Sequence, residues 1–130
     1  KMTAITINHL DHIVITVADI EATCEFYRRV LGMKSIRFDG KRVALVFGQQ
    51  KINLHPFGNE YEPKAKRPTP GSADLCFISE TSIVEVISHL VSEDVEIVEG
   101  PIRKTGAVGQ ITSVYLKDPD GNLIEISNYD

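Results

Sequence analysis

The fold is decided by residues 10–33, LDHIVITVADIEATCEFYRRVLGM. The first part of this stretch has the alternation of a β-strand, in which successive side chains point to opposite faces. One face is expected to be purely apolar and consists of Ile13, Ile15 and Val17. The other face carries His12, a polar residue in an unusual place for a strand.

A helix is expected to follow this strand directly. Asp19 stands where a helix N-cap would accept a hydrogen bond from a free backbone N–H, and Gly32 is expected to end the helix. The apolar stripe of the helix is formed by Ile20, Cys24, Tyr27 and Leu31. The apolar face of the strand is expected to pack against the apolar stripe of the helix, and this packing leaves His12 pointing away from the helix.

The composition limits the classes of protein to consider. A chain of 130 residues, 42% hydrophobic and 25% charged, is typical of one soluble globular domain. The net charge of -4 argues against nucleic acid as the main partner. No apolar run approaches the roughly 20 residues that span a bilayer, so no membrane partner is expected. Cys24 and Cys76 fit no zinc module, and free thiols point to a cytoplasmic location.

The first half continues with three expected strands and a connector. Lys34–Asp39 and Arg42–Phe47 are β-rich runs joined by the hairpin signal Asp39-Gly40-Lys41. A short strand, Lys51–His55, comes next. Pro56–Gly71 then holds four of the six prolines and is expected to be a connector.

The second half repeats this order. Its expected strands are Ala73–Ser79, Val95–Val98, Ile111–Lys117 and Leu123–Ser127. Ser82 and Glu85 have the spacing of a capping box, and the helix that they open has the stripe Ile83, Val86, Ile87 and Leu90. A loop is expected at Gly100–Gly109 and a turn at Asp118–Gly121. We therefore predict one domain of two βαβββ modules, at about 8–56 and 72–129 with the connector 57–71 between them, which build one surface together.

Polar side chains recur on the strand faces opposite the apolar ones. The residues concerned are His12, Asn53, His55, Asp74 and Glu125. A single strand histidine is commonly a hydrogen-bonded structural residue, and a single strand carboxylate is commonly just solvated. The coincidence of polar residues at matched positions of a repeated unit instead favours a shared ligand or metal site, because imidazole with carboxylates suits a divalent first-row metal.

These residues resemble the vicinal oxygen chelate superfamily, which includes glyoxalase I, fosfomycin-resistance thiol transferases, extradiol dioxygenases and bleomycin-binding proteins. The resemblance rests on the opening stretch, on paired βαβββ modules and on the ending VYLKDPDGNLIEISNY. The middle segments KINLHPFGNEYEPKAKRPTPGSADLC and GPIRKTGAVGQITSVY resemble the glyoxalase-domain group that includes bacterial proteins labelled virulence factors. The resemblance implies an α+β fold with a curved, cup-shaped mixed sheet and helices on its outer face.

The family takes its metal ligands from the first and last strands of each module. By position, this implies His12, Asp74 and Glu125 as ligands, although the family typically has His where Asp74 stands. The last strand of the first module offers Asn53, with His55 two residues on. His12, His55 and Glu125 would imitate the two-histidine, one-carboxylate arrangement that holds iron(II). His12, Asp74 and Glu125 would suit Mn, Ni or Zn, and both sets stay open.

The implied activity is that of a metal-dependent isomerase or lyase acting on a small substrate with vicinal oxygens. Glu125 is the expected base and acid. Asn53, Tyr115 and Arg103 are expected to contact the substrate, with Tyr115 and Arg103 near the mouth of the cup. The alternatives are a binding protein without chemistry, a dioxygenase and a thiol transferase of the same superfamily. The basic residues Lys64, Lys66 and Arg67 would attract an anionic substrate or form a solvated loop, and the solvated loop is the preferred interpretation.

The repeat also predicts the assembly. Each module leaves a sheet edge and half a cup, so a second module must close it, within one chain or across a two-fold axis. We expect a homodimer in which His12 of one chain meets Asp74 and Glu125 of its mate.

Overall fold

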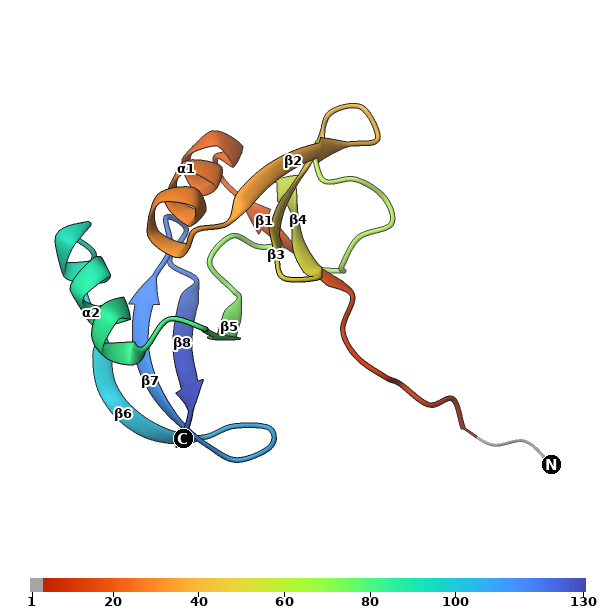
Figure 1. The fold of residues 1–130 in the computed structure, drawn as a ribbon. Coiled ribbons are helices and arrows are strands. Elements are labelled where there is room, and N and C mark those ends of the chain that lie inside the picture. Colours follow the sequence, from red (N-terminus) through yellow and green to blue (C-terminus); the bar gives the residue numbers. More distant parts are fainter. Residues whose placement is uncertain (1–3) are drawn as a thin grey trace.

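The computed structural model describes residues 4–130 and contains the predicted pair of βαβββ modules. Module one consists of β1 (His12–Val17), α1 (Ile20–Leu31), β2 (Lys34–Phe38), β3 (Arg42–Phe47) and β4 (Gln50–Pro56). Module two consists of β5 (Asp74–Ile78), α2 (Ile83–Ser92), β6 (Glu99–Thr105), β7 (Gln110–Lys117) and β8 (Leu123–Tyr129). In Figure 1 module one lies at the upper right and module two at the lower left.

Each module forms its own four-stranded mixed sheet. The strand orders are β1-β4-β3-β2 and β5-β8-β7-β6, with β1 parallel to β4 and β5 parallel to β8. The remaining pairs are antiparallel. The parallel pairs arise because the helix and two strands of each module provide the crossover that parallel neighbours require. The α+β class is confirmed, and within one chain the strands make two sheets.

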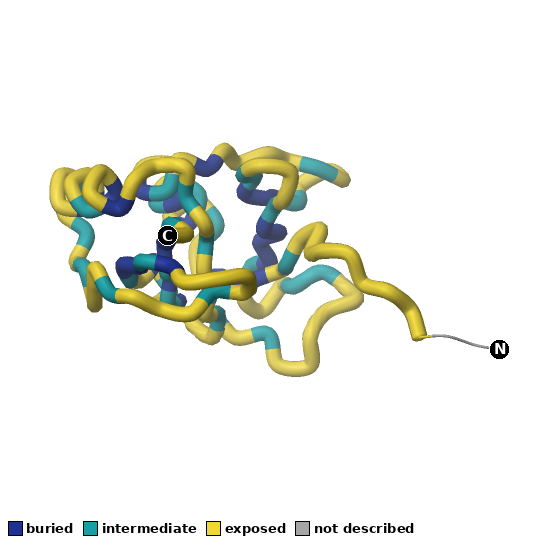
Figure 2. Tube along the Cα trace, turned by 60° about the horizontal axis from the view of Figure 1, so that its bottom comes forward, coloured by how far each residue is buried: buried dark blue, intermediate teal, exposed yellow. Residues whose placement is uncertain are grey.

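One face of each sheet packs under a helix, as the alternation predicts. Ile15 pairs with Leu54 in register, Leu75 pairs with Ile124, and all four belong to one hydrophobic cluster that spans both modules. Figure 2 shows the buried stretches of the chain mostly in the interior of the trace, with exposed stretches around its outside. We call the other side of each sheet its open face, and the candidate site residues other than Arg103 lie there.

The helices begin as the sequence predicts. The Asp19 side chain accepts from the Ala22 N–H at 3.0 Å, and the Ser82 side chain accepts from the Glu85 N–H. Gly32 ends α1 in the left-handed conformation. The buried face of α1 is centred on Thr23, Tyr27 and Val30, which leaves Cys24 only half-buried at the margin of the predicted stripe.

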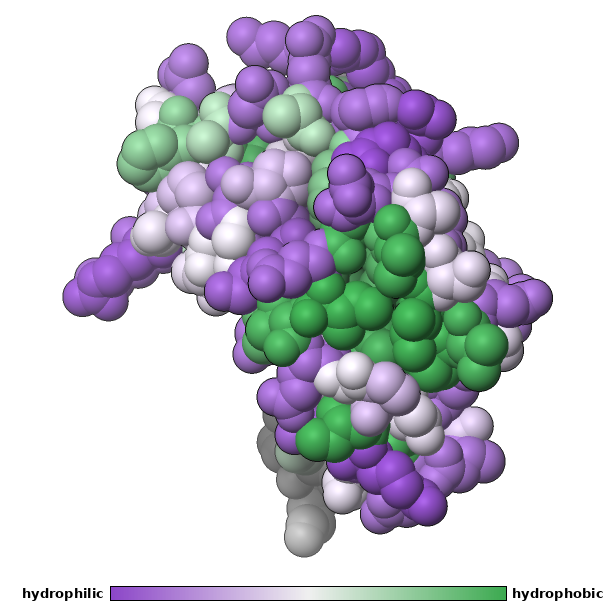
Figure 3. Space-filling view, turned by 90° about the vertical axis from the view of Figure 1, so that its left-hand side faces the viewer, coloured by the Kyte–Doolittle hydropathy of each residue, from purple (hydrophilic) through white to green (hydrophobic). Residues whose placement is uncertain are grey.

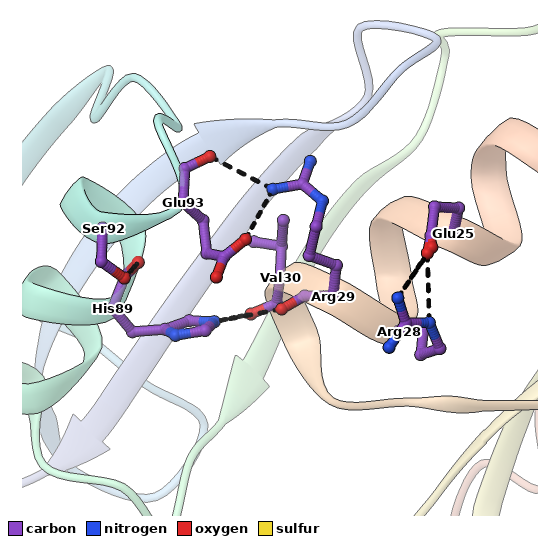
Figure 4. A network of polar contacts seen from close by, with 7 residues as sticks. All are labelled: Glu25, Arg28, Arg29, Val30, His89, Ser92 and Glu93. Carbon is purple, nitrogen blue, oxygen red and sulfur yellow. Dashed lines mark hydrogen bonds and ion pairs between the residues drawn. The ribbon is translucent and has the colours of Figure 1, made fainter.

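The two modules meet through their helices. Arg29 Nη1 donates to Glu93 Oε1 at 2.8 Å, and His89 Nε2 donates to the Val30 carbonyl oxygen at 3.0 Å (Figure 4). Beside these contacts is an apolar hollow of about 460 Å³ whose lining includes Phe47 and Phe77. Figure 3 shows hydrophobic side chains gathered in a broad patch on this side of the molecule.

One predicted strand is wrong. Val95–Val98 has no regular structure, and β6 lies instead in the segment expected to be a loop. Val95 and Ile97 alternate because they pack against the core. β6 tolerates Pro101 because it is an edge strand with a register shift between Glu99 and Ile102.

Among residues 4–130, neither helix combines the length and apolar character that crossing a lipid bilayer demands.

Candidate functional site

The open face of module two brings three chemically active side chains side by side. Glu125 on β8 is in register with Cys76 on β5 and with Tyr115 on β7. Adjacent residues in register on neighbouring strands have Cβ atoms about 5 Å apart, so the three side chains share one patch. Glu125 therefore lies at the centre of this open face.

The carboxylate of Glu125 is held by buried hydroxyls. Ser113 Oγ donates to Glu125 Oε2 at 2.6 Å, and Ser127 Oγ donates to the same oxygen at 3.4 Å. The two serine oxygens lie 2.6 Å apart, and both side chains are fully buried. Both serine hydroxyls thus reach the same carboxylate oxygen, Oε2.

Two further groups beside Glu125 are held in their protonated forms. Burial, together with the charge of Glu125, raises the pKa of Tyr115 to about 12. Burial also raises the pKa of the Cys76 thiol, whose sulfur lies 3.3 Å from Ser127 Oγ. At neutral pH the Tyr115 hydroxyl therefore remains a hydrogen-bond donor, and Cys76 is not a thiolate nucleophile.

This patch lines a pocket of about 400 Å³. Its walls are completed by β5, by the turn that joins β6 to β7 and by the end of β8. The lining residues are Cys76, Ile78, Lys104, Thr105, Gly106, Ala107, Ile111, Tyr115, Glu125 and Tyr129. The pocket is large enough for a small organic molecule.

The open face of module one carries three of the predicted residues, His12, Asn53 and His55. His12 is in register with Lys51, and its Nδ1 lies 2.9 Å from Asp11 Oδ2. Asn53 is 5% exposed, and its side-chain oxygen has no hydrogen-bond partner among residues 4–130.

His55 already has protein partners. Its Nε2 lies 3.2 Å from Arg42 Nη2, and the edge of its ring meets Tyr61. Since arginine can only donate, Nε2 must accept, and the proton is on Nδ1. Burial, with the nearby charge of Arg42, lowers the pKa of His55 and keeps the imidazole neutral.

The structure separates the other two predicted residues. Asp74 begins β5 and is exposed, two residues before Cys76 and on the same face. Arg103 is in register with Thr112, which places it on the face opposite Tyr115, and it pairs with Asp130. Arg103 therefore does not line the Glu125 pocket, contrary to its expected position near the mouth of the cup.

The donors of one chain do not fit a metal ion. Among residues 4–130, no three His, Cys, Asp or Glu side chains are grouped so that they could hold one. His12 and Glu125 belong to the open faces of different modules, and Arg42 occupies Nε2 of His55. Neither of the two predicted ligand sets is assembled within a single chain.

Sequence reasoning missed the serines that hold Glu125. Ser113 and Ser127 lie on the same strand face as Tyr115 and Glu125 because they are two residues away along β7 and β8. Period-two alternation, applied to polar residues as well as apolar ones, would have found them.

A sheet pair of this topology with polar open faces defines a glyoxalase-like protein. Residues 9–126 match the model of the Glyoxalase/Bleomycin resistance protein/Dioxygenase superfamily, and the chain belongs to that superfamily.

Two named relatives are similar along nearly the whole chain. Virulence protein STM3117 of Salmonella typhimurium is 57% identical, over 95% of this chain and 85% of that protein. Its crystal structure has a TM-score of 0.96 at 56% identity, covering 97% of this chain and 100% of that one. Glyoxalase domain-containing protein RDO1 of Mycosarcoma maydis is 52% identical, over 96% of this chain and 70% of that protein.

A more distant neighbour shares the fold alone. The crystal structure of lactoylglutathione lyase from Agrobacterium tumefaciens has a TM-score of 0.72 at 20% identity, with 95% of each chain covered.

Proposed function

We propose that this chain is an isomerase or lyase acting on a small molecule with adjacent oxygenated carbons. The observation that carries the proposal is Glu125, whose Oε2 is held by two buried serines while its side chain lines an open pocket. A base held in this way is oriented before the substrate arrives, which is the geometry that proton transfer requires.

The proposed reaction moves one proton between adjacent carbons. Glu125 takes the proton from the carbon next to the substrate carbonyl, and negative charge develops on the carbonyl oxygen. Tyr115 remains protonated at neutral pH and donates toward that oxygen. Glu125 then returns the proton to the neighbouring carbon, and the proton of the substrate hydroxyl passes to the former carbonyl oxygen, so the hydroxyl and the carbonyl exchange places with no net gain or loss of protons or electrons.

We propose that the site is completed in a homodimer. In one chain His12 and Glu125 lie on the open faces of different modules, and no three metal-binding side chains are grouped among residues 4–130. The open face of module one from one copy would cover that of module two from the other, with His12 opposite Asp74 and Glu125 of its mate. These three donors would hold a divalent cation, and Mn, Ni or Zn suits them better than iron(II). The chemistry that such a cation would supply is the polarisation of vicinal oxygens.

The test is solvent-proton exchange measured by NMR. Protein supplied separately with each metal is incubated in D₂O with a panel of α-hydroxy ketones and hemithioacetals, and deuterium entering a substrate carbon is followed. Glu125→Gln should abolish exchange while the far-UV circular dichroism spectrum is unchanged. Glu96→Gln removes an equal charge from an exposed loop position and should retain exchange. Undiminished exchange in Glu125→Gln would remove Glu125 as the base.

A second candidate is a small-molecule binding protein without chemistry. It is favoured by the lack of a three-donor metal cluster among residues 4–130 and by Asp74, where the superfamily typically has histidine. A binder would capture its ligand equally well with Glu125→Gln and would show no exchange with any metal. Metal analysis of protein purified without a histidine tag distinguishes a dioxygenase from the other candidates, since bound iron would favour a dioxygenase.

We also propose a cytoplasmic location, because both cysteines are free thiols, as a reducing compartment would keep them.

A further inference from the structure

A second pocket lies where the connector crosses the ends of β1 and β4. Its volume is about 290 Å³, and it is separate from the Glu125 pocket. It is lined by Val14, Ile15, Thr16, His55, Lys64, Ala65, Arg67, Pro68, Thr69, Ser72, Ala73 and Asn122. The connector thus forms a wall over part of the open face of module one.

The charged residues in this lining are all cations. Lys64 and Arg67 contribute positive charge, and the lining contributed by residues 4–130 includes no carboxylate. Lys64 is partly neutralised, because its ammonium lies 3.7 Å from Glu60 and 3.1 Å from Glu62. The Arg67 side chain forms no hydrogen bond or ion pair within residues 4–130, so its guanidinium is available to a ligand.

The loop that carries Arg67 is held by its own hydrogen bonds. Thr69 Oγ1 donates to the Arg67 carbonyl oxygen at 3.1 Å, and Ser72 Oγ donates to the Thr69 carbonyl oxygen at 2.7 Å. These bonds fix the backbone at the position from which the guanidinium extends. Little ordering of this loop would therefore be needed when a ligand binds.

The floor of the pocket supplies neutral donors. His55 carries its proton on Nδ1, because Nε2 accepts from Arg42. Thr16 is 7% exposed and contributes a hydroxyl to the lining. The amide of Asn122 is already used, since Oδ1 accepts from the Ala73 N–H and Nδ2 donates to Asp118. Donors with few competing acceptors select a ligand that accepts hydrogen bonds.

From this arrangement we infer that the pocket binds the oxyanion group, carboxylate or phosphate, of a small molecule, with Arg67 as its two-pronged anchor. A planar guanidinium matches both groups through paired hydrogen bonds. Val14, Ala65 and Pro68 add an apolar wall, which suits a ligand with a hydrocarbon part next to its charge.

The pocket also bears on the substrate. It borders the open face of module one, which the proposed dimer sets opposite Glu125. An oxyanion held here would then belong to the substrate of Glu125, and this inference of an anionic substrate rests on the proposed function. Binding of an oxyanion in this pocket stands without it.

The test is a titration with inorganic phosphate and, separately, sodium acetate at constant ionic strength, followed by calorimetry and by NMR chemical shifts. Saturable binding of either probe to the wild-type protein is expected, and the preferred probe identifies the group. Arg67→Ala should weaken binding by about tenfold or more. Lys66→Ala removes the same charge from the neighbouring exposed residue, which does not line the pocket, and should bind as wild type does.

The inference would be overturned if neither probe bound saturably, or if Arg67→Ala and Lys66→Ala weakened binding equally. Arg67→Lys should recover only part of the affinity, because it keeps the charge and loses the fork. Glu125→Gln separates this pocket from the proposed reaction. It should lose exchange and keep phosphate or acetate binding, and loss of binding in that variant would contradict the assignment.

Discussion

The Tyr27 hydroxyl donates a 2.7 Å hydrogen bond to Asp118 Oδ2, which joins α1 of module one to the β7–β8 turn of module two. Tyr27 is fully buried and Asp118 is 6% exposed. The same carboxylate accepts from Asn122 Nδ2 and from the backbone N–H groups of Asp120 and Asn122. Burial, followed by the charge of Asp118, raises the pKa of Tyr27, so the phenol stays neutral and keeps donating.

Tyr27→Phe should destabilise the protein by about 1.5–3 kcal/mol, because it takes one donor from a buried carboxylate. The free energy of unfolding, measured by urea denaturation, checks this value. Tyr129→Phe is the matched control, since its hydroxyl accepts from the Val108 N–H at an exposed site. Equal losses in the two variants would show that the bond between the modules contributes nothing beyond a surface contact.

Ser82→Ala should lower the free energy of unfolding by about 1 kcal/mol, because α2 loses its N-cap acceptor for the Glu85 N–H. Urea denaturation again provides the measurement. Ser92→Ala, at the other end of α2, removes a hydroxyl that only donates to the His89 carbonyl oxygen and should cost less. If Ser92→Ala proves the more harmful, the cap does not stabilise α2 in the way described.

Stability should fall as the pH falls below the unfolded-state pKa of His55, which is about 6.5. Burial and Arg42 lower the folded-state pKa, so in this range the unfolded chain binds the proton more readily than the folded one. The contribution of His55 is therefore fully present above that pH and is lost as the pH drops through the folded-state pKa. Urea denaturation at a series of pH values measures it.

The matched variants for this effect are His55→Gln and His9→Gln. His55→Gln keeps an acceptor for Arg42 and should flatten the dependence of stability on pH. His9 is exposed on the N-terminal segment, so its replacement should leave the curve unchanged. An unaltered slope in His55→Gln would assign the pH dependence to other groups.

Mixed dimers test the shared site. His12→Ala and Glu125→Gln should each abolish exchange, whereas a mixed dimer of the two variants retains one intact pair of His12 and Glu125. Random mixing should therefore restore about a quarter of wild-type activity. Light scattering should give twice the chain mass of 14.4 kDa. A monomeric mass, or no recovery on mixing, would contradict a site shared between copies.

Much of the fold follows from local patterns. Alternation in β1 and β8 correctly separated Ile15 and Ile126 from the open faces, and Asp19 and Ser82 cap the helices as predicted. The error at Val95–Val98 has a physical cause, because alternating apolar residues can pack on a core without forming a strand. Arg103 was misplaced because the β6 register could not be inferred without β6 itself.

The sequence by itself determined the repeated modules, their turns and which side chains share a strand face, because these depend on periods of two and 3.6 residues and on local hydrogen bonds. Only the tertiary structure decided that Ser113 donates a hydrogen bond to Glu125 and that Arg42 donates one to His55. It also decided that His12 and Glu125 lie on the open faces of different modules. These relationships join residues on different strands. They are fixed by sheet register and by the packing of the modules, for which no local pattern codes.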